Sequence, residues 1–473
     1  MKKWGRLLLI FITAFTITAC AGAGKTVDPR TMTFPPLKFE IPKSERVQLE
    51  NGMVVYLLED HELPLVNITA YVATGSIYEP PEKTGLAGLT GAVMRSGGTA
   101  ELPPEKMDAE LEFMASAVES SIGSDMGNVS LSTLTKNLNR TLEIFAQVLM
   151  NPAFREDRLT LAKNRTIEGL RRQNDDPQGV ANRELRKALY PGHPLGRHPT
   201  IETVKGITRE EMASFHRNYY HPNNVILAVS GDFTKGEMLE KLRTSFAGWE
   251  KTPVTSPPVA EPTTDIKPAV LLARKDVNQS VVRMGHLGIE KSNPDLYSVR
   301  VMDYILGGGF TSRLTTEIRS NQGLAYNVDS YFDVGRRFIG TFIAETETKS
   351  ESTVRTISLM RDIIAGMTSA PVTDQELKLA KDAIINSFIF GFAKPDAVAN
   401  QQARLEFYNY SPGFLENYRD NIAKVTKEDV LRVAKKYLHP DEMVLMVVGD
   451  EMKFDKPLST FGAVKEIKLE NGK

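Results

Sequence analysis

Apolar and polar positions along the chain follow two different periods, which together predict a mixture of strands and helices. In the first half, alternation at every second residue predicts strands over 46–58, 66–74 and 129–133. Helical spacing of apolar residues predicts helices over 83–94, 104–115, 138–150 and 157–173. In the second half, the same patterns predict strands over 281–287 and 341–345 and helices over 297–306, 354–367 and 374–392. Because strands and helices do not alternate regularly, the pattern favours an α+β fold over a doubly wound sheet.

One helix–turn–strand unit occurs twice in the chain. Residues 207–232 read ITREEMASFHRNYYHPNNVILAVSGD, residues 425–450 read VTKEDVLRVAKKYLHPDEMVLMVVGD, and the two copies align without a gap. In each copy a threonine (Thr208 or Thr426) with an acidic residue at the third helical position predicts a helix N-cap. A His-Pro pair ends each helix, and an apolar strand follows it. One unit used twice at a long interval indicates a duplicated domain.

The length of the chain and its proline-rich stretches suggest where the domains divide. With 473 residues the chain is long enough for two or more domains. A Pro/Thr-rich stretch predicts a linker over 252–268. We therefore expect one domain over 44–251 and a homologous one over 269–460.

The N-terminus has the features of a bacterial lipoprotein leader. Three cations precede an apolar segment over 7–17 that is too short to span a bilayer. Small residues then precede Cys20, the only cysteine, whose position favours lipidation over an incidental thiol. We expect a signal peptide over 1–19 and a proline-containing tether over 20–43. Lipidated Cys20 would be the membrane anchor of a periplasm-facing protein of the bacterial cell envelope, in the outer membrane.

Charge and histidine spacing exclude two classes of function. The formal net charge is −1, so no basic excess exists to bind nucleic acid. Zinc peptidases usually place two histidines one helical turn apart beside a carboxylate. His61-Glu62 begins such a pattern, but Leu65 stands in the fourth position and Pro64 forbids the helix. The sequence therefore predicts no metal site among its seven histidines: His61, His193, His198, His216, His221, His286 and His439.

The most distinctive segment, residues 307–331, reads GGGFTSRLTTEIRSNQGLAYNVDSY. Its three glycines lack the Gly-Lys-Ser/Thr ending of a phosphate-binding loop, and they predict a tight turn after a helix that ends at Leu306. A short helix, Gly323 and an alternating strand follow. From residue types alone, Arg319 is a surface cation and Tyr326 an amphipathic strand residue.

From about Arg46 to about Asp450, the chain resembles the insulinase/pitrilysin family of zinc peptidases, in its processing-peptidase branch. The family's G-L-x-H-x-x-E-H frame is matched by residues 85–92, GLAGLTGA. The resemblance implies that Gly88 and Ala92 stand at the two zinc histidines, Gly91 at the general base and Glu168 at the remaining ligand. One carboxylate cannot hold zinc, which takes about four ligands, so we expect no zinc in this chain and only a helix-surface or structural role for Glu168.

The second-half signature of the family is intact in Ser312-Arg313-Leu314, Arg319, Gly323-Leu324 and Tyr326. In active members this arginine and tyrosine hydrogen-bond the substrate carbonyl as it becomes tetrahedral, which stabilises the developing oxyanion. In some bacterial two-chain members one chain keeps the zinc motif and its partner keeps this pair.

The resemblance therefore implies two insulinase-type domains in tandem, in a subunit that is inactive alone. A zinc-bearing homologue would be its partner, and a peptide the shared substrate. The alternative is a catalytically inactive assembly or scaffold lipoprotein. No group of residues supports an independent enzyme of another type.

Overall fold

The computed structural model of the chain describes residues 39–469. The expected signal peptide, Cys20 and nearly all of the expected tether lie outside the described residues. From Ile41 onward the described residues form one compact unit. Within residues 39–469, no helix is both long and apolar enough to cross a membrane.

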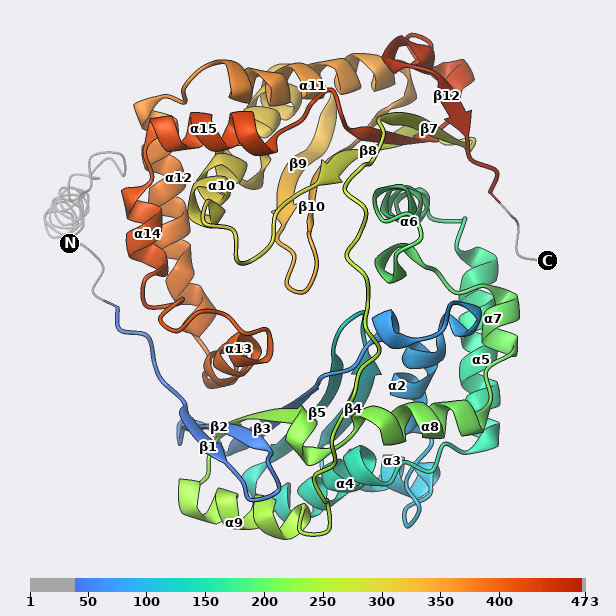
Figure 1. The fold of residues 1–473 in the computed structure, drawn as a ribbon, viewed down its shortest axis with the longest axis vertical. Helices are drawn as coiled ribbons and strands as arrows, with labels where there is room; N and C mark the ends of the chain where they lie inside the picture. Colours follow the sequence, from blue (N-terminus) through green and yellow to red (C-terminus); the bar gives the residue numbers. More distant parts are fainter. Residues whose placement is uncertain (1–38, 470–473) are drawn as a thin grey trace, which may run out of the picture. The chain divides into compact units, whose positions relative to one another are not determined.

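The first half contains a six-stranded sheet in the order β1–β2–β6–β3–β5–β4 (Figure 1). β2 and β6 run parallel, and the other neighbours are antiparallel. In β5 buried residues alternate with more exposed ones, as expected when one face of a sheet lies in the core. The strands are β1 (Glu45–Gln48), β2 (Val54–Glu59), β3 (Leu65–Val72), β4 (Ala117–Ile122), β5 (Gly127–Leu134) and β6 (Val225–Gly231).

The second half repeats this sheet in the order β12–β7–β11–β8–β10–β9. β11 is parallel to β7 and antiparallel to β8, just as β6 is parallel to β2 and antiparallel to β3. Only the outer strand differs, because β12 comes from beyond residue 460 and pairs parallel to β7. The strands are β7 (Ala269–Arg274), β8 (Gln279–Leu287), β9 (Ala325–Asp333), β10 (Thr341–Lys349), β11 (Val444–Gly449) and β12 (Val464–Glu466). The predicted α+β fold with an internal duplication is confirmed.

The predicted helix–turn–strand repeat forms α8 (Arg209–Tyr219) with β6, and α15 (Lys427–Tyr437) with β11. Both helices begin with a reciprocal capping box. The threonine side chain accepts a hydrogen bond from the backbone N–H of the third helical residue, and the acidic side chain of that residue accepts one from the backbone N–H of the threonine. These bonds satisfy donors that a helix start otherwise leaves unpaired.

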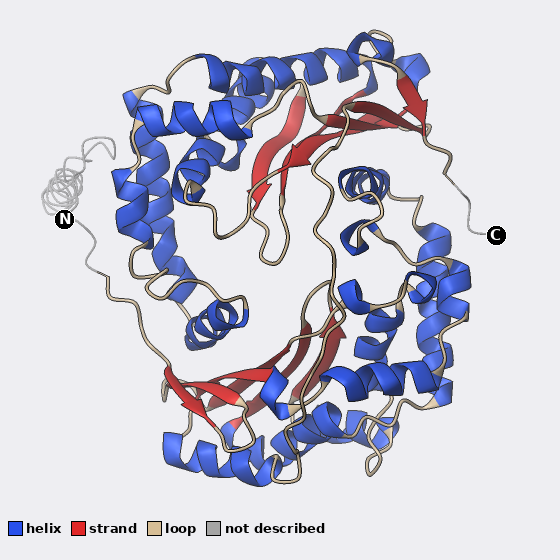
Figure 2. Ribbon diagram, in the orientation of Figure 1, coloured by secondary structure: helices blue, strands red, loops and turns tan. Residues whose placement is uncertain are grey.

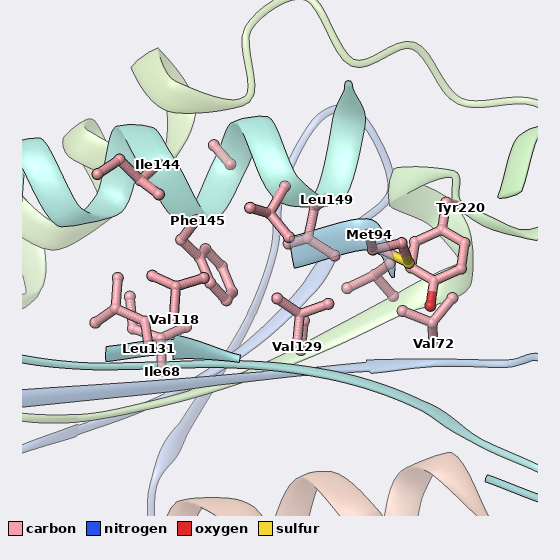
Figure 3. Packing of buried hydrophobic residues seen from close by; sticks show 14 of the residues in the cluster. Ile68, Val72, Met94, Val118, Val129, Leu131, Ile144, Phe145, Leu149 and Tyr220 are labelled. Carbon is pink, nitrogen blue, oxygen red and sulfur yellow. The ribbon is translucent and has the colours of Figure 1, made fainter. Parts of the chain in front are cut away.

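A layer of helices covers one face of each sheet (Figure 2). In the first half, Phe145 and Leu149 of α4 and Met94 of α2 pack on Ile68 and Val129 of the sheet (Figure 3). The first layer includes α2 (Leu86–Ser96), α3 (Pro104–Phe113), α4 (Leu138–Met150), α5 (Glu156–Arg172), α7 (Ile201–Lys205), α8 and α9 (Lys235–Ser245). The second includes α10 (Leu296–Asp303), α11 (Thr353–Ser369), α12 (Asp374–Ser387), α14 (Tyr418–Lys424) and α15.

Each half also contributes one helix to the opposite face of the other half's sheet. α6 (Pro177–Leu189) buries Val180 and Leu185 in a cluster with residues of β7, β8 and β11. α13 (Pro395–Phe407) packs Ala399 and Ala403 on the first sheet, where the Tyr71 hydroxyl donates a hydrogen bond of 3.0 Å to Asn400. The two halves are therefore joined by packing as well as by residues 251–268, which contain no helix or strand.

Candidate functional site

Residues 85–92, which the resemblance matched to the zinc frame, form the start of α2, and a buried carboxylate holds that start. Gly85 precedes the helix in a left-handed conformation (φ 108°). The Glu79 carboxylate accepts hydrogen bonds from the backbone N–H groups of Gly85 (3.0 Å) and Ala87 (2.9 Å). Burial raises the pKa of Glu79, and these N–H donors oppose the rise. A carboxylate at this position complements the positive end of the helix dipole.

The three motif positions on α2 differ in the space around them. Gly88 and Ala92 are exposed, and a Cβ on Gly88 would have no heavy atom within 4 Å. Gly91 is buried, and a Cβ there would lie 2.7 Å from the carbonyl carbon of Ser121 and closer still to the backbone nitrogen of Ile122. The Ser120 hydroxyl also donates a hydrogen bond of 2.6 Å to the Gly91 carbonyl. Helix α2 therefore crosses β4 at Gly91 with no room for a glutamate.

The remaining expected position, Glu168, lies on the exposed surface of α5. Its carboxylate is 3.8 Å from the nearest guanidinium nitrogen of Arg171 and 3.5 Å from that of Arg172. Both partners lie on the same helix, so these exposed pairs contribute little to stability.

Across residues 39–469, no three His, Cys, Asp or Glu side chains are grouped so that they could hold a metal ion. Three of the histidines in residues 39–469 are buried, His193, His216 and His286, and burial lowers the pKa values of His216 and His286 to about 4. The His216 ring bonds the Leu149 carbonyl oxygen (2.8 Å), and the His286 ring bonds the Leu287 carbonyl oxygen (2.7 Å). These histidines are neutral packing residues.

Arg319 and Tyr326, which the resemblance implied as a pair, lie together. The Arg319 Cζ is 4.7 Å from the centroid of the Tyr326 ring and 5.1 Å from that of Phe310. Both rings are largely exposed, Tyr326 by 83% and Phe310 by 77%. No carboxylate within the described part of the chain lies at ion-pair distance from Arg319. The guanidinium is thus positioned by cation–π contacts, and its N–H donors are left for another molecule.

The other residues of the signature build the support for this pair. Arg313 makes two hydrogen bonds to Glu376, of 2.7 and 3.1 Å, and the Glu376 carboxylate also caps α12. The Thr315 hydroxyl donates to the Val328 carbonyl of β9 at 3.2 Å. Residues 315–321 form a π-helical turn, η8, anchored by buried Leu314 and Ile318. Arg313 therefore fixes the turn from which Arg319 projects.

The tight turn predicted at the three glycines is confirmed at the last of them, where the Gly309 carbonyl accepts a hydrogen bond of 3.0 Å from the Ser312 N–H, but the helix does not end at Leu306. The chain instead widens into a second π-helical turn, η7 (Tyr304–Gly308), that continues α10. A Cβ on Gly307 would lie 2.7 Å from the Ser330 Cβ, so glycine is needed for the close approach of η7 to β9. None of the three glycines has a positive φ.

A polar cluster beside Tyr326 was missed by sequence reasoning. Tyr326, Asp329 and Glu345 line a cavity of about 320 Å³ on β9 and β10. Arg283 of β8 pairs with Glu345 at 2.8 Å, and burial raises the pKa values of Asp329 and Glu345. The register pairs Glu345 with both Asp329 and Arg283, so alternation places these three side chains on one face and would have been the signal. Tyr326 lies beside them where the register of β9 and β10 shifts.

Comparison with known proteins places this arrangement in a family. The profile described as "Insulinase (Peptidase family M16)" matches residues 54–203, and that described as "Peptidase M16 inactive domain" matches residues 206–384. The chain belongs to the M16 family of insulinase-type peptidases.

Two curated relatives match most of the chain. An "Uncharacterized zinc protease YmxG" of Bacillus subtilis is 23% identical over 415 residues, covering 85% of this chain and 98% of the relative. A "Non-peptidase homolog YmxG" of Helicobacter pylori is 23% identical over 400 residues, covering 84% and 91%. The names thus include both a protease and a non-peptidase.

Solved structures share the fold. A "peptidase M16 inactive domain" from Pseudomonas fluorescens has a TM-score of 0.77 with 27% identity. The match covers 86% of this chain and 98% of the Pseudomonas chain. The "periplasmic protease PqqL" of Escherichia coli has a TM-score of 0.72 with 16% identity, and this chain covers 49% of it. The latter similarity concerns the fold alone.

Proposed function

We propose that this chain is the non-zinc subunit of a two-chain M16 peptidase, in which Arg319 and Tyr326 stabilise the oxyanion formed at the zinc of a homologous partner. Peptide-bond hydrolysis is the reaction, the partner supplies the metal and the general base, and a peptide is the substrate. The observation that carries this proposal is the Arg319 guanidinium, stacked between two exposed rings without a carboxylate partner in residues 39–469.

Catalysis of acyl transfer by such donors depends on fixed geometry. An oxyanion is best stabilised by donors that need no reorganisation when charge develops. The Tyr326 and Phe310 rings restrict the Arg319 side chain, and the Arg313–Glu376 bonds restrict the turn beneath it. The phenol hydroxyl of Tyr326 and the guanidinium of Arg319 together offer two kinds of donor.

Helix α2 supports a division of labour between two chains. A histidine would fit at Gly88, but a glutamate at Gly91 would overlap the backbone of β4. The general base is therefore absent from this chain for a steric reason as well as by residue type. In the proposal, the zinc and the general base therefore come from the partner chain.

The envelope location of the chain also belongs to the proposal. Cys20 would carry the lipid that holds the protein at the periplasmic face of the bacterial outer membrane. The leader pattern supports this location, as does the fold shared with a protein described as a periplasmic protease.

The second candidate is a catalytically inactive assembly or scaffold protein. It is favoured by the relative described as a non-peptidase homologue. Exposed aromatic residues beside an arginine, as at Phe310, Arg319 and Tyr326, are also common at the centres of protein interfaces. In this case the same three residues would bind a partner without taking part in chemistry.

Co-purification from the native envelope distinguishes the candidates. The partner captured with the full-length chain is identified, and zinc content and peptide hydrolysis are measured for each chain alone and for the pair. The proposal expects a partner that contains H-x-x-E-H and zinc, and hydrolysis that requires both chains. A zinc-bearing partner that is fully active alone, or a partner without zinc, supports the scaffold instead.

A further inference from the structure

A second cavity, of about 740 Å³, lies within the C-terminal half and is lined by residues 296–418. Its walls come from α10, η7, α12 and α13 and from the segments that follow β9 and α13. Its volume falls in the range of pockets that hold small organic ligands, roughly 300 to 1,000 Å³. Tyr326 and Arg319 do not line it, so it is separate from the proposed oxyanion site.

Three guanidinium groups line this cavity: those of Arg300, Arg336 and Arg404. Within the described part of the chain, none of the three lies at ion-pair distance from a carboxylate. Arg336 stacks on the Tyr408 ring, with its Cζ 5.2 Å from the centroid. The negative charge of Asp125 helps to raise the pKa of Arg336. The same carboxylate accepts a hydrogen bond of 3.2 Å from the Tyr408 hydroxyl and lies 3.6 Å from the Arg337 guanidinium. Three arginines around one cavity without carboxylate partners leave strong N–H donors for an anion.

The single acidic side chain in the cavity lining is deeply buried and incompletely bonded. Asp303 is 7% exposed. Its Oδ2 accepts from the backbone N–H of Phe332 at 3.2 Å, while its Oδ1 has no hydrogen-bond partner. Burial raises the pKa of Asp303 to about 7, so near neutral pH much of this group is a hydroxyl donor. Asp303 therefore adds a buried carboxyl group with an unpaired oxygen to the wall of the cavity.

Aromatic rings make up a large part of the remaining wall. Phe388 stacks on Tyr418 with centroids 5.1 Å apart, and Tyr410 and Phe414 are 4.7 Å apart. Burying an apolar ligand against these rings would stabilise the complex, whereas a small inorganic anion would leave the rings in contact with water. A planar carboxylate matches the two-pronged donor geometry of arginine.

We propose that this cavity binds a carboxylate carried on an apolar or aromatic body. Arg300 and Arg404 hold the carboxylate, and the ring cluster of Phe388, Tyr410, Phe414 and Tyr418 covers the apolar part. The same chemistry is presented by the C-terminus of a peptide that ends in aromatic residues and by a free aryl-alkyl carboxylic acid.

Calorimetric titration of the full-length chain tests this site with three probes. They are N-acetyl-Ala-Phe-Phe with a free C-terminal carboxylate, the same peptide as its C-terminal amide, and 3-phenylpropanoate. We expect the peptide acid to bind at least about tenfold more tightly than the amide, since a charged hydrogen bond is lost with the amide. If 3-phenylpropanoate binds as tightly as the peptide acid, a small acid is sufficient as the ligand. If only the peptide acid binds, the ligand is a peptide end.

Variants of the arginines provide the second arm. Arg300→Gln and Arg404→Gln should each weaken binding of the acid roughly ten- to hundredfold and leave amide binding unchanged. Arg361→Gln is the control, because Arg361 is an arginine of the same half that lies outside the cavity, over the ring of Phe461 at 5.6 Å. Equal binding of acid and amide by the unaltered chain, no binding of any probe, or full acid binding by both folded variants would overturn the proposal.

Discussion

The backbone nitrogen of Ile122 lies so close to Gly91 that no side chain fits between them. Gly88, on the same helix, faces open space. The position that the resemblance assigns to the general base is therefore closed by β4, whereas the position it assigns to the first zinc histidine is free.

Alanine at these two glycines should have opposite effects. Gly91→Ala should lower the free energy of unfolding by about 1–3 kcal/mol, because its Cβ forces α2 away from β4. Gly88→Ala should leave it unchanged or raise it by about 0.5–1 kcal/mol, because alanine favours the helix and meets no neighbour. Urea unfolding of both variants measures the difference. Equal effects would mean that the contact with β4 is not tight.

The isolated chain should bind no stoichiometric zinc and hydrolyse no peptide. The reason is that Gly88, Gly91 and Ala92 offer no ligand or base, and Glu168 is a single exposed carboxylate. Elemental analysis after dialysis against zinc, together with a peptidase assay, checks this. Tight zinc binding with chelator-sensitive activity would show a metal site built from other residues.

Replacing Cys20 should detach the protein from the membrane. If the leader pattern is used as we expect, Cys20→Ala removes the acylation site, and the chain is either released into the soluble fraction or keeps its leader. Fractionation and mass spectrometry of the N-terminus report both results. Detergent-dependent membrane association of a processed mutant would contradict a lipid anchor at this residue.

Buried neutral histidines should make the fold sensitive to acid. Burial lowers the pKa of His286 to about 4, against about 6.5 in an unfolded chain. Its contribution to stability is therefore present above pH 6.5 and is lost as the pH falls from 6.5 towards 4, because the unfolded chain takes up the proton first. Over that window His286→Asn should reduce the slope of unfolding free energy against pH by up to about 1.4 kcal/mol per pH unit. An unchanged slope would mean that His286 is already charged in the folded protein.

Much of the fold could be predicted because its local signals are strong. The capping boxes at Thr208 and Thr426 and the strands after them are encoded within one short unit, and the structure contains both copies. The close position of Arg319 and Tyr326 follows from a short turn between them.

Other features depend on contacts that a local pattern does not specify. The apolar faces of α6 and α13 predict that each helix covers a sheet but do not specify which sheet. In the structure each helix packs on the sheet of the other half. The π-helical turn at Tyr304–Gly308 depends on the approach of Gly307 to Ser330, a strand residue distant in sequence. Phe310 gives no sign in the sequence that it stacks on Arg319.

The turnover number of the reconstituted pair is the measurement that tests the central claim most directly. Arg319→Ala or Tyr326→Phe in this chain, assayed with an unaltered zinc-bearing partner, should lower kcat about a hundred- to a thousandfold, since each removes a donor to the oxyanion. Zinc content, association of the two chains and thermal stability should hardly change. The control is Arg355→Ala, which should keep full activity, because Arg355 is an exposed arginine that donates a hydrogen bond of 2.7 Å to Gln322. Full turnover with both Arg319→Ala and Tyr326→Phe would contradict the catalytic role and leave the scaffold as the function of this chain.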